Sequence, residues 1–306
     1  KGLNPDDYPL SGAGIAGDLF PWEQVVDDRN VQGATAIAVP GLVDGVGQAH
    51  DRFGRMPWGD LLQPAIELAR DGLHVDWYAA LIIASTTRAL AADPDAAALF
   101  LEDGQWPTIA GWTSLSDKRI DMGGMATSLA ELAGKGAREL YDGDLGAAMA
   151  ADVQAKGGSL SHEDLRAYHA EFSAPLSFDY RDARLHAVPG LTAGPTFRQT
   201  LGTMERTTFG TAPDATSFVA TSEGLFQAYE DRLQTMGDTG ETAAHAGCTT
   251  HFSVVDRAGN MVAQTQTLLS IFGSSIPSLI VIIATLGSTR VCRLTRAVAM
   301  NVVVME

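Results

Sequence analysis

The sequence predicts an α+β fold in which several helices precede a sheet, and three observations support that prediction. Apolar residues recur at helical spacing in a series of segments between residues 42 and 237. Apolar and polar residues alternate with a period of two in residues 176–190 and again in residues 250–267. The sequence contains no internal repeat and no low-complexity linker. We therefore expect a mixed fold in which the helices come first along the chain and a sheet follows them.

The composition is that of a globular protein with an acidic surface. The 306 residues can form one large domain or two small ones, and 45% of them are hydrophobic while 19% are charged. A formal net charge of −16 would repel nucleic acid and anionic membrane surfaces. We therefore expect no nucleic-acid partner and no membrane partner, and small neutral or zwitterionic ligands remain open.

The N-terminal part is expected to contain one strand and two helices. Residues 35–46 are interpreted as a β-branched strand that Pro40 and Gly41 end, followed by a helix that continues to Arg55. A second helix is expected over residues 57–72, with Gly72 as its stop. Its apolar positions recur at helical spacing: Leu61, Leu62, Ala65, Ile66 and Ala69.

Further helices are expected at four places along the chain. Their ranges are 125–143, 145–158, 161–171 and 222–237. The third opens with Ser161 followed three residues later by Asp164, a pattern that resembles a capping box.

Two strand pairs are expected in the second half of the chain. Residues 176–190 alternate around a turn at Arg181 and Asp182. Residues 250–267 alternate around a turn at residues 256–260, where Gly259 can adopt a positive φ at low cost.

Metal, nucleotide and disulfide chemistry find little support in the sequence. Cys248 and Cys292 match no zinc spacing and cannot build a disulfide scaffold. The seven histidines form no metal-binding motif, and the glycines near residue 123 lack the lysine of a phosphate loop. We therefore expect no metal and no cofactor. The chain begins with neither a methionine nor a signal peptide, so it is interpreted as part of something longer, and its compartment is not fixed.

Residues 274–306 differ in composition from the rest of the chain. They hold three arginines and one glutamate, and they include the apolar run SLIVIIATLG, which is too short for the ~20 residues of a membrane helix. Two interpretations stay open for this run: a buried strand, or an atypical tail such as a changed reading frame would produce. The second interpretation predicts that the tail packs poorly.

The threonines around residue 249 raise a chemical question. A threonine hydroxyl becomes an effective nucleophile at a chain's N-terminus, where its own α-amine serves as the base. Thr249 could reach that state only if the Cys248–Thr249 peptide bond were cut. The alternatives are an ordinary threonine-rich hairpin, or Cys248 itself as the nucleophile, although an isolated cysteine is more often an inert buried residue.

The segment CTTHFSVVDRAGN at 248–260 resembles the self-cleavage site of the γ-glutamyltransferases (γ-glutamyltranspeptidases), which are N-terminal-nucleophile hydrolases. Three further segments resemble their large subunit, and the resemblance covers about residues 33–273. These segments are AVPGLVDGVGQAHDRFGRMPWGDLLQPAIELARDGLHV (38–75), YDGDLGAAMAADVQAKGGSLSHEDLRAY (141–168) and LTAGPTFRQTL (191–201). The resemblance implies an αββα N-terminal-nucleophile hydrolase sandwich, incomplete at the C-terminus of this chain.

The resemblance also implies a site and a reaction. Thr249 would be the nucleophile for autocleavage after Cys248 and then for acyl transfer from γ-glutamyl amides such as glutathione to water, amino acids or peptides. Thr267 would support it with its hydroxyl. Residues 1–248 would be a large-subunit-like segment, 249–273 the start of a small subunit that pairs with it as a heterodimer, and 274–306 the atypical tail. The family also makes a periplasmic or secreted location conceivable.

Three departures from the family pattern leave other functions open. Leu269 stands where the family commonly has an asparagine, and the first arginine is Arg29, outside the expected substrate-binding motif. Leu269 favours an acylase-like member with a different acyl specificity, and the missing arginine leaves the α-carboxylate of a glutamyl substrate without its usual partner. No Gly-Gly oxyanion hole can be assigned after Gly273, which favours a catalytically inactive, truncated or frameshifted remnant. On that ground we expect the 306-residue polypeptide to stay uncut and to show no measurable γ-glutamyl transfer.

Overall fold

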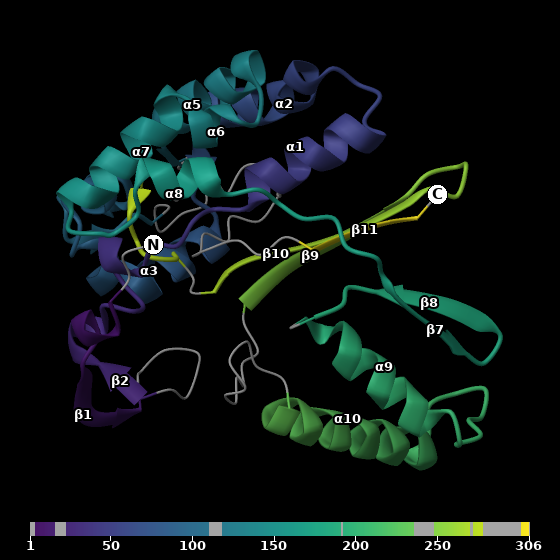
Figure 1. Ribbon diagram of the computed structural model, residues 1–306. Helices are drawn as coiled ribbons and strands as arrows, with labels where there is room; N and C mark the ends of the chain where they lie inside the picture. The colour runs from purple at the N-terminus through teal and green to yellow at the C-terminus, as the bar shows by residue number, and fades with distance from the viewer. Residues whose placement is uncertain are drawn as a thin grey trace. The chain divides into compact units, whose positions relative to one another are not determined.

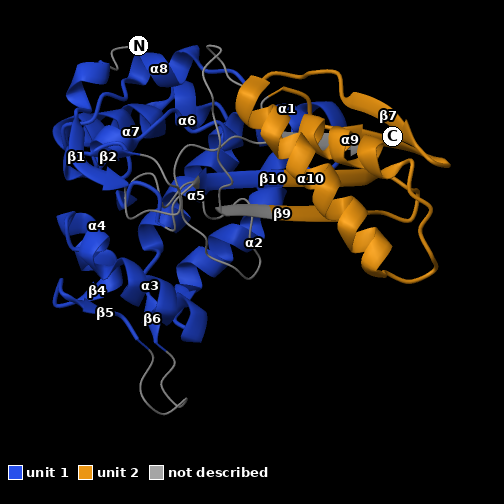
Figure 2. Ribbon diagram, turned by 90° about the horizontal axis from the view of Figure 1, so that it is seen from below, with its two compact units in different colours: residues 1–170, 247–250, 265–300 blue, residues 171–246, 251–264, 301–306 orange. Residues whose placement is uncertain are grey.

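The computed structural model describes residues 4–15, 23–109, 118–190, 192–235, 248–269, 272–277 and 301–305, with only the backbone described for 248–250, 269 and 301–305. The chain divides into two compact units, coloured separately in Figure 2. Unit 1 comprises residues 1–170, 247–250 and 265–300, and unit 2 comprises residues 171–246, 251–264 and 301–306.

Unit 1 is built mainly of helices, with short antiparallel strand pairs at its loops (Figure 1). Its helices are α1 (Leu42–Phe53), α2 (Trp58–Asp71), α3 (Trp77–Leu90), α4 (Pro94–Phe100), α5 (Gly123–Lys135), α6 (Glu139–Asp142), α7 (Asp144–Ala155) and α8 (His162–Ala167). Its strand pairs are β1 (Leu10–Ile15) with β2 (Glu23–Val25), β3 (Leu73–His74) with β6 (Arg119–Ile120), and β4 (Leu101–Glu102) with β5 (Trp106–Pro107).

The predicted second helix is confirmed as α2. It buries Leu62, Ile66 and Ala69 and packs against α5. The Trp58 Nε1 donates a hydrogen bond to the Leu132 carbonyl at 2.8 Å, so the start of α2 is fixed to α5. Gly72 follows the helix with φ of 82°, and a Cβ there would lie 2.7 Å from the Ile120 carbonyl oxygen. Only glycine fits this position.

Two predictions on local structure need correction. The strand expected before Pro40 is absent: residues Ala34–Ala36 form a 3₁₀ turn, and the following residues reach α1 without pairing to a strand among the described residues. Ile37 is nevertheless buried, so the apolar run reflected burial and not strand pairing. The helix expected over residues 125–143 is divided into α5 and α6 at Gly136, whose φ is 91°.

The capping box predicted for α8 is confirmed. The Ser161 Oγ accepts a hydrogen bond from the Asp164 amide at 3.1 Å, and the Asp164 carboxylate accepts one from the Ser161 amide at 3.1 Å. The Ser161 hydroxyl also donates to Asp164 at 2.6 Å, and this hydrogen bond is the main reason that the pKa of Asp164 falls to about 2. The reciprocal bonds satisfy amides that the helix start would otherwise leave without partners.

Unit 2 contains a strand pair and two helices. Strands β7 (Leu176–Tyr180) and β8 (Ala183–Ala187) pair antiparallel with Leu176 opposite Ala187 and Tyr180 opposite Ala183, which confirms the predicted pair. Helices α9 (Ala193–Met204) and α10 (Ala215–Thr235) pack against each other. Their close approach depends on Gly224, because a Cβ there would lie 3.0 Å from the Thr200 carbonyl oxygen.

A three-stranded sheet contains the segment predicted to carry the chemistry. Its strands are β9 (Cys248–Val255), β10 (Met261–Leu269) and β11 (Asn301–Met305), with β10 in the middle. None of the helices in the described part of the chain is long and apolar enough to cross a membrane.

Candidate active site

The turn between β9 and β10 is held by one aspartate. The Asp256 Oδ1 accepts hydrogen bonds from the amides of Ala258 at 2.8 Å and Asn260 at 2.9 Å, and the Oδ2 accepts one from the Asn260 Nδ2 at 2.7 Å. The bond from the Asn260 side chain is the first of several that lower the pKa of Asp256. Gly259 has a φ of 87°. The predicted hairpin and its turn are therefore confirmed, and the turn residues explain its geometry.

The described side chains of β10 divide between two faces. Gln264 and Leu268 are 7% and 2% exposed, whereas Thr265 and Thr267, on the opposite face of the pleat, are half-buried. On β9 the His251 Nε2 and the Ser253 Oγ lie 3.1 Å apart, so these two side chains share one face. The hairpin therefore has one side that Gln264 and Leu268 bury and another side lined with hydroxyl groups.

The end of β10 is anchored in the core of unit 1. Leu268, Phe272 and Ile276 all belong to the main apolar cluster, and the Phe272 ring meets the Phe100 ring edge to face at a centroid distance of 5.2 Å. The Gly33 amide donates a hydrogen bond to the Ser274 carbonyl at 2.8 Å. Thr267 is thus next to a residue that is fixed in the core.

The packing of Phe272 and Ile276 in the core extends into the segment that was predicted to be an atypical tail. Ser274 and Ser275 are 1% and 4% exposed, and Ile276 is 3% exposed, so the first residues of the 274–306 segment are packed. The apolar run that follows, with Cys292, lies outside the described residues.

The predicted site residues lie in neighbouring strands. Cys248 and Thr249 begin β9 and Thr267 lies near the end of β10, while the side chains at 248 and 249 are outside the described part. Leu269 is the last residue of β10. Arg29 follows a 3₁₀ turn, where its carbonyl accepts a 2.7 Å bond from the Thr35 hydroxyl.

A buried cluster of charged side chains in unit 1 was not predicted from the sequence. Asp44 is 2% exposed, and its Oδ1 accepts a hydrogen bond from the Arg138 Nη1 at 2.9 Å. Its Oδ2 accepts bonds from the Ala170 amide at 2.6 Å and the Gln48 Nε2 at 2.7 Å. Burial alone would raise the pKa of Asp44, but these bonds and the Arg138 charge outweigh it and lower the pKa.

The other polar side chains of this cluster also have hydrogen-bond partners. The Tyr141 hydroxyl donates to the Pro40 carbonyl at 2.8 Å and accepts from the Asp44 amide at 3.0 Å. Arg138 forms a two-bond contact with Asp142, at 2.8 Å and 2.9 Å. Every carboxylate and guanidinium group here has a partner, so we interpret the cluster as a structural link between α1, α6 and the segment after α8. In the described residues no group of three metal-binding side chains is present.

Comparisons with known proteins add an independent finding. A family model described as Gamma-glutamyltranspeptidase matches residues 11–247. The chain is 31% identical to the Acylase ACY 1 proenzyme of Pseudomonas sp. (strain V22), over 82% of this chain and 50% of that protein. It is 31% identical to the Glutathione hydrolase proenzyme of Escherichia coli (strain K12), over 89% of this chain and 53% of that protein. The chain thus spans about half the length of the curated relatives it matches.

Solved structures agree on the fold. The gamma-glutamyltranspeptidase of Helicobacter pylori superposes with a TM-score of 0.63 at 23% identity, covering 70% of this chain and 61% of that one. The gamma-glutamyltranspeptidase of Pseudomonas nitroreducens, complexed with L-DON, superposes with a TM-score of 0.59 at 24% identity, covering 75% of this chain and 67% of that one. These likenesses confirm the predicted α+β sandwich class.

Proposed function

The chain belongs to the gamma-glutamyltranspeptidase family, and from this premise we propose that its β9–β10 hairpin carries an amide-cleaving acyl-transfer site with Thr249 as nucleophile. Thr267 supports the nucleophile through its hydroxyl. The named relatives are hydrolases and acylases that are made as proenzymes, which is consistent with a nucleophile released by chain cleavage.

The register of the hairpin is the observation that carries this proposal. The Asp256 amide donates to the Asn260 carbonyl at 3.0 Å, which makes residues 256 and 260 a hydrogen-bonded pair. Thr249 lies seven residues before the first and Thr267 seven after the second. An unbroken ladder therefore sets Thr249 directly opposite Thr267. Since hydrogen-bonded and non-bonded pairs alternate, these two form a non-bonded pair, in which side chains approach most closely.

The chemistry needs two stages. First the Thr249 hydroxyl attacks the Cys248 carbonyl, and the acyl group moves from nitrogen to oxygen, which frees the α-amine of Thr249. Water then hydrolyses the ester, which releases the Cys248 carboxylate and restores the Thr249 hydroxyl. That amine then takes the hydroxyl proton as Thr249 attacks a substrate amide, and it returns the proton to the departing amine. Water or an amino group finally accepts the acyl group from the enzyme. No residue at this site is assigned to a metal or cofactor.

The cleavage also defines the proposed organisation. Residues 1–248 form the large-subunit-like segment and Thr249 begins the small-subunit part, so the processed protein is a heterodimer of the two pieces. Its partners are small γ-glutamyl or acyl amides.

The substrate class has two candidates. A γ-glutamyl amide such as glutathione follows from the family and from the glutathione hydrolase relative. An acyl amide without an α-amino group is favoured by Leu269, which cannot hydrogen-bond that amino group through its side chain as an asparagine could. The similarity to Acylase ACY 1 points the same way.

One experiment tests the nucleophile separately from autocleavage. A site-specific protease sequence placed directly before Thr249 would allow that residue to become N-terminal on demand. We expect the cut chain, and not the uncut one, to form an acyl-enzyme with a γ-glutamyl or a glutaryl p-nitroanilide, detected by mass. Thr249→Ser should retain some reaction and Thr249→Ala none. The glutaryl compound lacks only the α-amino group, so the preferred member of the pair decides between the substrate classes. Absence of acylation on cut chains would contradict the proposal.

A further inference from the structure

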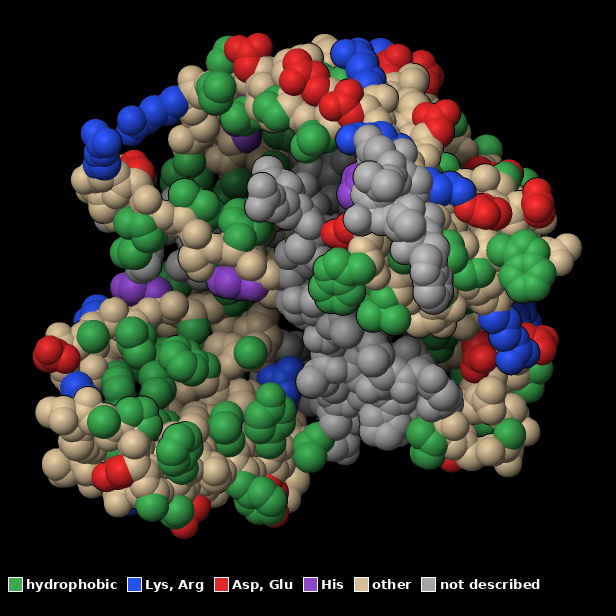
Figure 3. All heavy atoms as spheres, turned by 180° about the vertical axis from the view of Figure 1, so that it is seen from behind, with side chains coloured by type: hydrophobic (Ala, Val, Ile, Leu, Met, Phe, Trp, Pro, Cys, Tyr) green, Lys and Arg blue, Asp and Glu red, His purple; other side chains and the backbone are tan. Residues whose placement is uncertain are grey.

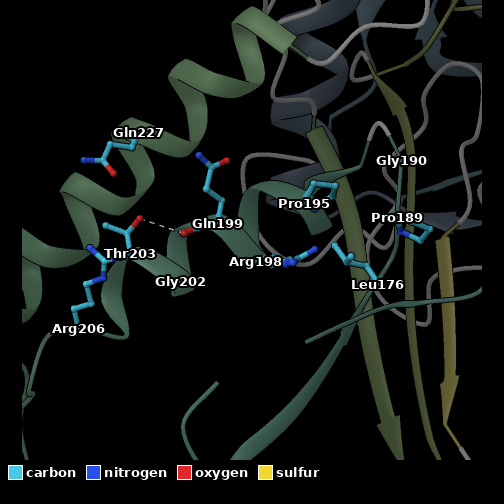
Figure 4. A pocket seen from close by; sticks show the side chains of 10 residues that line it. All are labelled: Leu176, Pro189, Gly190, Pro195, Arg198, Gln199, Gly202, Thr203, Arg206 and Gln227. Atoms are coloured by element: carbon cyan, nitrogen blue, oxygen red, sulfur yellow. Dashed lines mark hydrogen bonds between the residues drawn. The ribbon is translucent and has the colours of Figure 1, made fainter. Parts of the chain in front are cut away.

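A groove runs along one face of α9 in unit 2. Its volume is about 830 Å³, which falls within the range of small-molecule sites. Figure 4 shows its side chains, which come from α9, from α10 and from the chain around β7 and β8. The lining residues are Leu176, Pro189, Gly190, Pro195, Arg198, Gln199, Gly202, Thr203, Arg206 and Gln227.

The residues that α9 and its C-terminal end contribute follow helical spacing. They recur every three or four residues from Pro195 to Arg206. Arg198 lies on α9, about 9 Å along the helix axis from its last residue, Met204, and Arg206 follows that residue by two positions. Gly202 lies between them, and a Cβ built there meets no atom within 4 Å. The groove is therefore open at Gly202, with one arginine on each side of this opening (Figure 4).

The charge of the groove is opposite to that of the chain. The chain carries 37 acidic against 21 basic residues, yet the lining contains two arginines and no acid. No hydrogen bond or ion pair joins Arg198 or Arg206 to another of the described residues. The side-chain amide of Gln199, which also lines the groove, donates a hydrogen bond to the Asp231 carboxylate.

We propose that this groove binds an extended small molecule with a carboxylate at each end. A guanidinium group binds a carboxylate through two parallel hydrogen bonds, and two such groups in one groove favour a ligand that reaches both. Gln199, Gly202 and Thr203 lie between the two arginines, and Leu176, Pro189 and Pro195 add apolar surface beyond Arg198 (Figure 4). Thr249 is not among the residues that line the groove, and the proposal extends beyond the proposed acyl-transfer function.

Titration with matched acids tests the proposal on the intact chain. Sebacate carries two carboxylates on a straight alkyl chain, and decanoate has the same chain length with one. We expect sebacate to bind at least about fivefold more tightly, and added salt to weaken its binding. Arg198→Gln and Arg206→Gln should each weaken sebacate binding by about fivefold to tenfold. Arg88→Gln is the matched control, because Arg88 is exposed on α3, far from the groove in sequence, and should change nothing.

Gly202→Leu provides a second, independent test. A Cβ at Gly202 meets no atom within 4 Å, so we expect the fold and helix content to be kept, while the leucine fills the groove and abolishes sebacate binding. Equal affinity for sebacate and decanoate, or unchanged binding in Gly202→Leu, would overturn the proposal. So would arginine variants that bind like Arg88→Gln.

Discussion

The two units bury very different side chains. In unit 1 the largest buried side chains include Phe100, Leu129 and Tyr141, all 0% exposed. In unit 2 the buried residues of α10 are Ala220, Gly224 and Ala228, while Phe218 and Phe226 are 66% and 73% exposed. Figure 3 shows hydrophobic side chains at the surface of the region that holds α9 and α10.

The difference shows two ways of holding helices together. Unit 1 depends on the volume of its buried side chains, whereas α9 and α10 are held by close backbone approach and by polar contacts. The Arg232 Nη1, for example, donates to the Thr192 carbonyl at 2.7 Å. The ends of the β9–β10 hairpin, with the proposed nucleophile, belong to unit 1, the unit with the larger buried side chains.

The largest effect is expected from emptying the core of unit 1. Phe100→Ala should lower the free energy of unfolding by about 3–5 kcal/mol, because it leaves a cavity and removes the contact with Phe272. Phe226→Ala removes the same ring from an exposed position and should cost less than about 1 kcal/mol. Urea unfolding of both variants measures the contrast. Equal losses of unfolding free energy in the two variants would mean that the exposure of a side chain does not determine its contribution to stability in the two units.

Breaking the buried ion pair should have the next largest effect. Arg138→Met leaves Asp44 charged and without the guanidinium group that is bonded to it, and should cost about 3 kcal/mol at neutral pH. The pKa of Asp44 is lowered in the folded chain, so its contribution is present above the unfolded pKa of about 3.9 and is lost as the pH falls through the lower folded value. The loss of stability caused by Arg138→Met should therefore shrink in acid. Unfolding curves between neutral pH and pH 3 check this, and a constant loss would refute it.

Within unit 2, replacing each of two glycines on facing helices by alanine should change the free energy of unfolding in opposite directions. Gly224→Ala should cost about 1–3 kcal/mol, since its methyl group would press on the Thr200 carbonyl. Gly202→Ala has open space and should stabilise by about 0.5–1 kcal/mol through its helix propensity. Thermal unfolding of the pair provides the comparison. Destabilisation by both substitutions would show that α9 is more tightly covered than its contacts indicate.

The smallest effect concerns a single helix start in unit 1. Ser161→Ala removes the cap of α8 and should cost about 1 kcal/mol. It should also raise the pKa of Asp164 from about 2 toward the ordinary value of an aspartate, because the Ser161 hydroxyl is the main cause of the lowering. An NMR titration of the Asp164 carboxyl measures this shift. An unchanged pKa would place its cause elsewhere.

The parts of the fold that local chemistry determines were predictable from the sequence. The spacing in α2, the Ser161 cap and the Asp256–Asn260 turn each depend on residues close in the chain. The Asp44–Arg138 pair was not predicted, since it joins residues 94 apart. The strand expected before Pro40 was wrong because a buried β-branched run looks the same whether or not it pairs. For the candidate site, the turn predicted the hairpin, while the anchoring of its end by Phe272 and Phe100 depends on tertiary packing.

The register of the hairpin decides whether Thr267 lies opposite Thr249 and can support it. Thr249→Cys and Thr267→Cys can be combined in a chain whose natural cysteines are replaced by Cys248→Ser and Cys292→Ser. If positions 249 and 267 form a non-bonded pair, mild oxidation should join them in a disulfide, measured by mass and by loss of free thiol. The matched pair of Thr249→Cys with Gln266→Cys has its second cysteine on the opposite face of β10 and should stay reduced. A disulfide at 249 and 266 with none at 249 and 267 would mean a shifted register, and Thr267 could not then support Thr249.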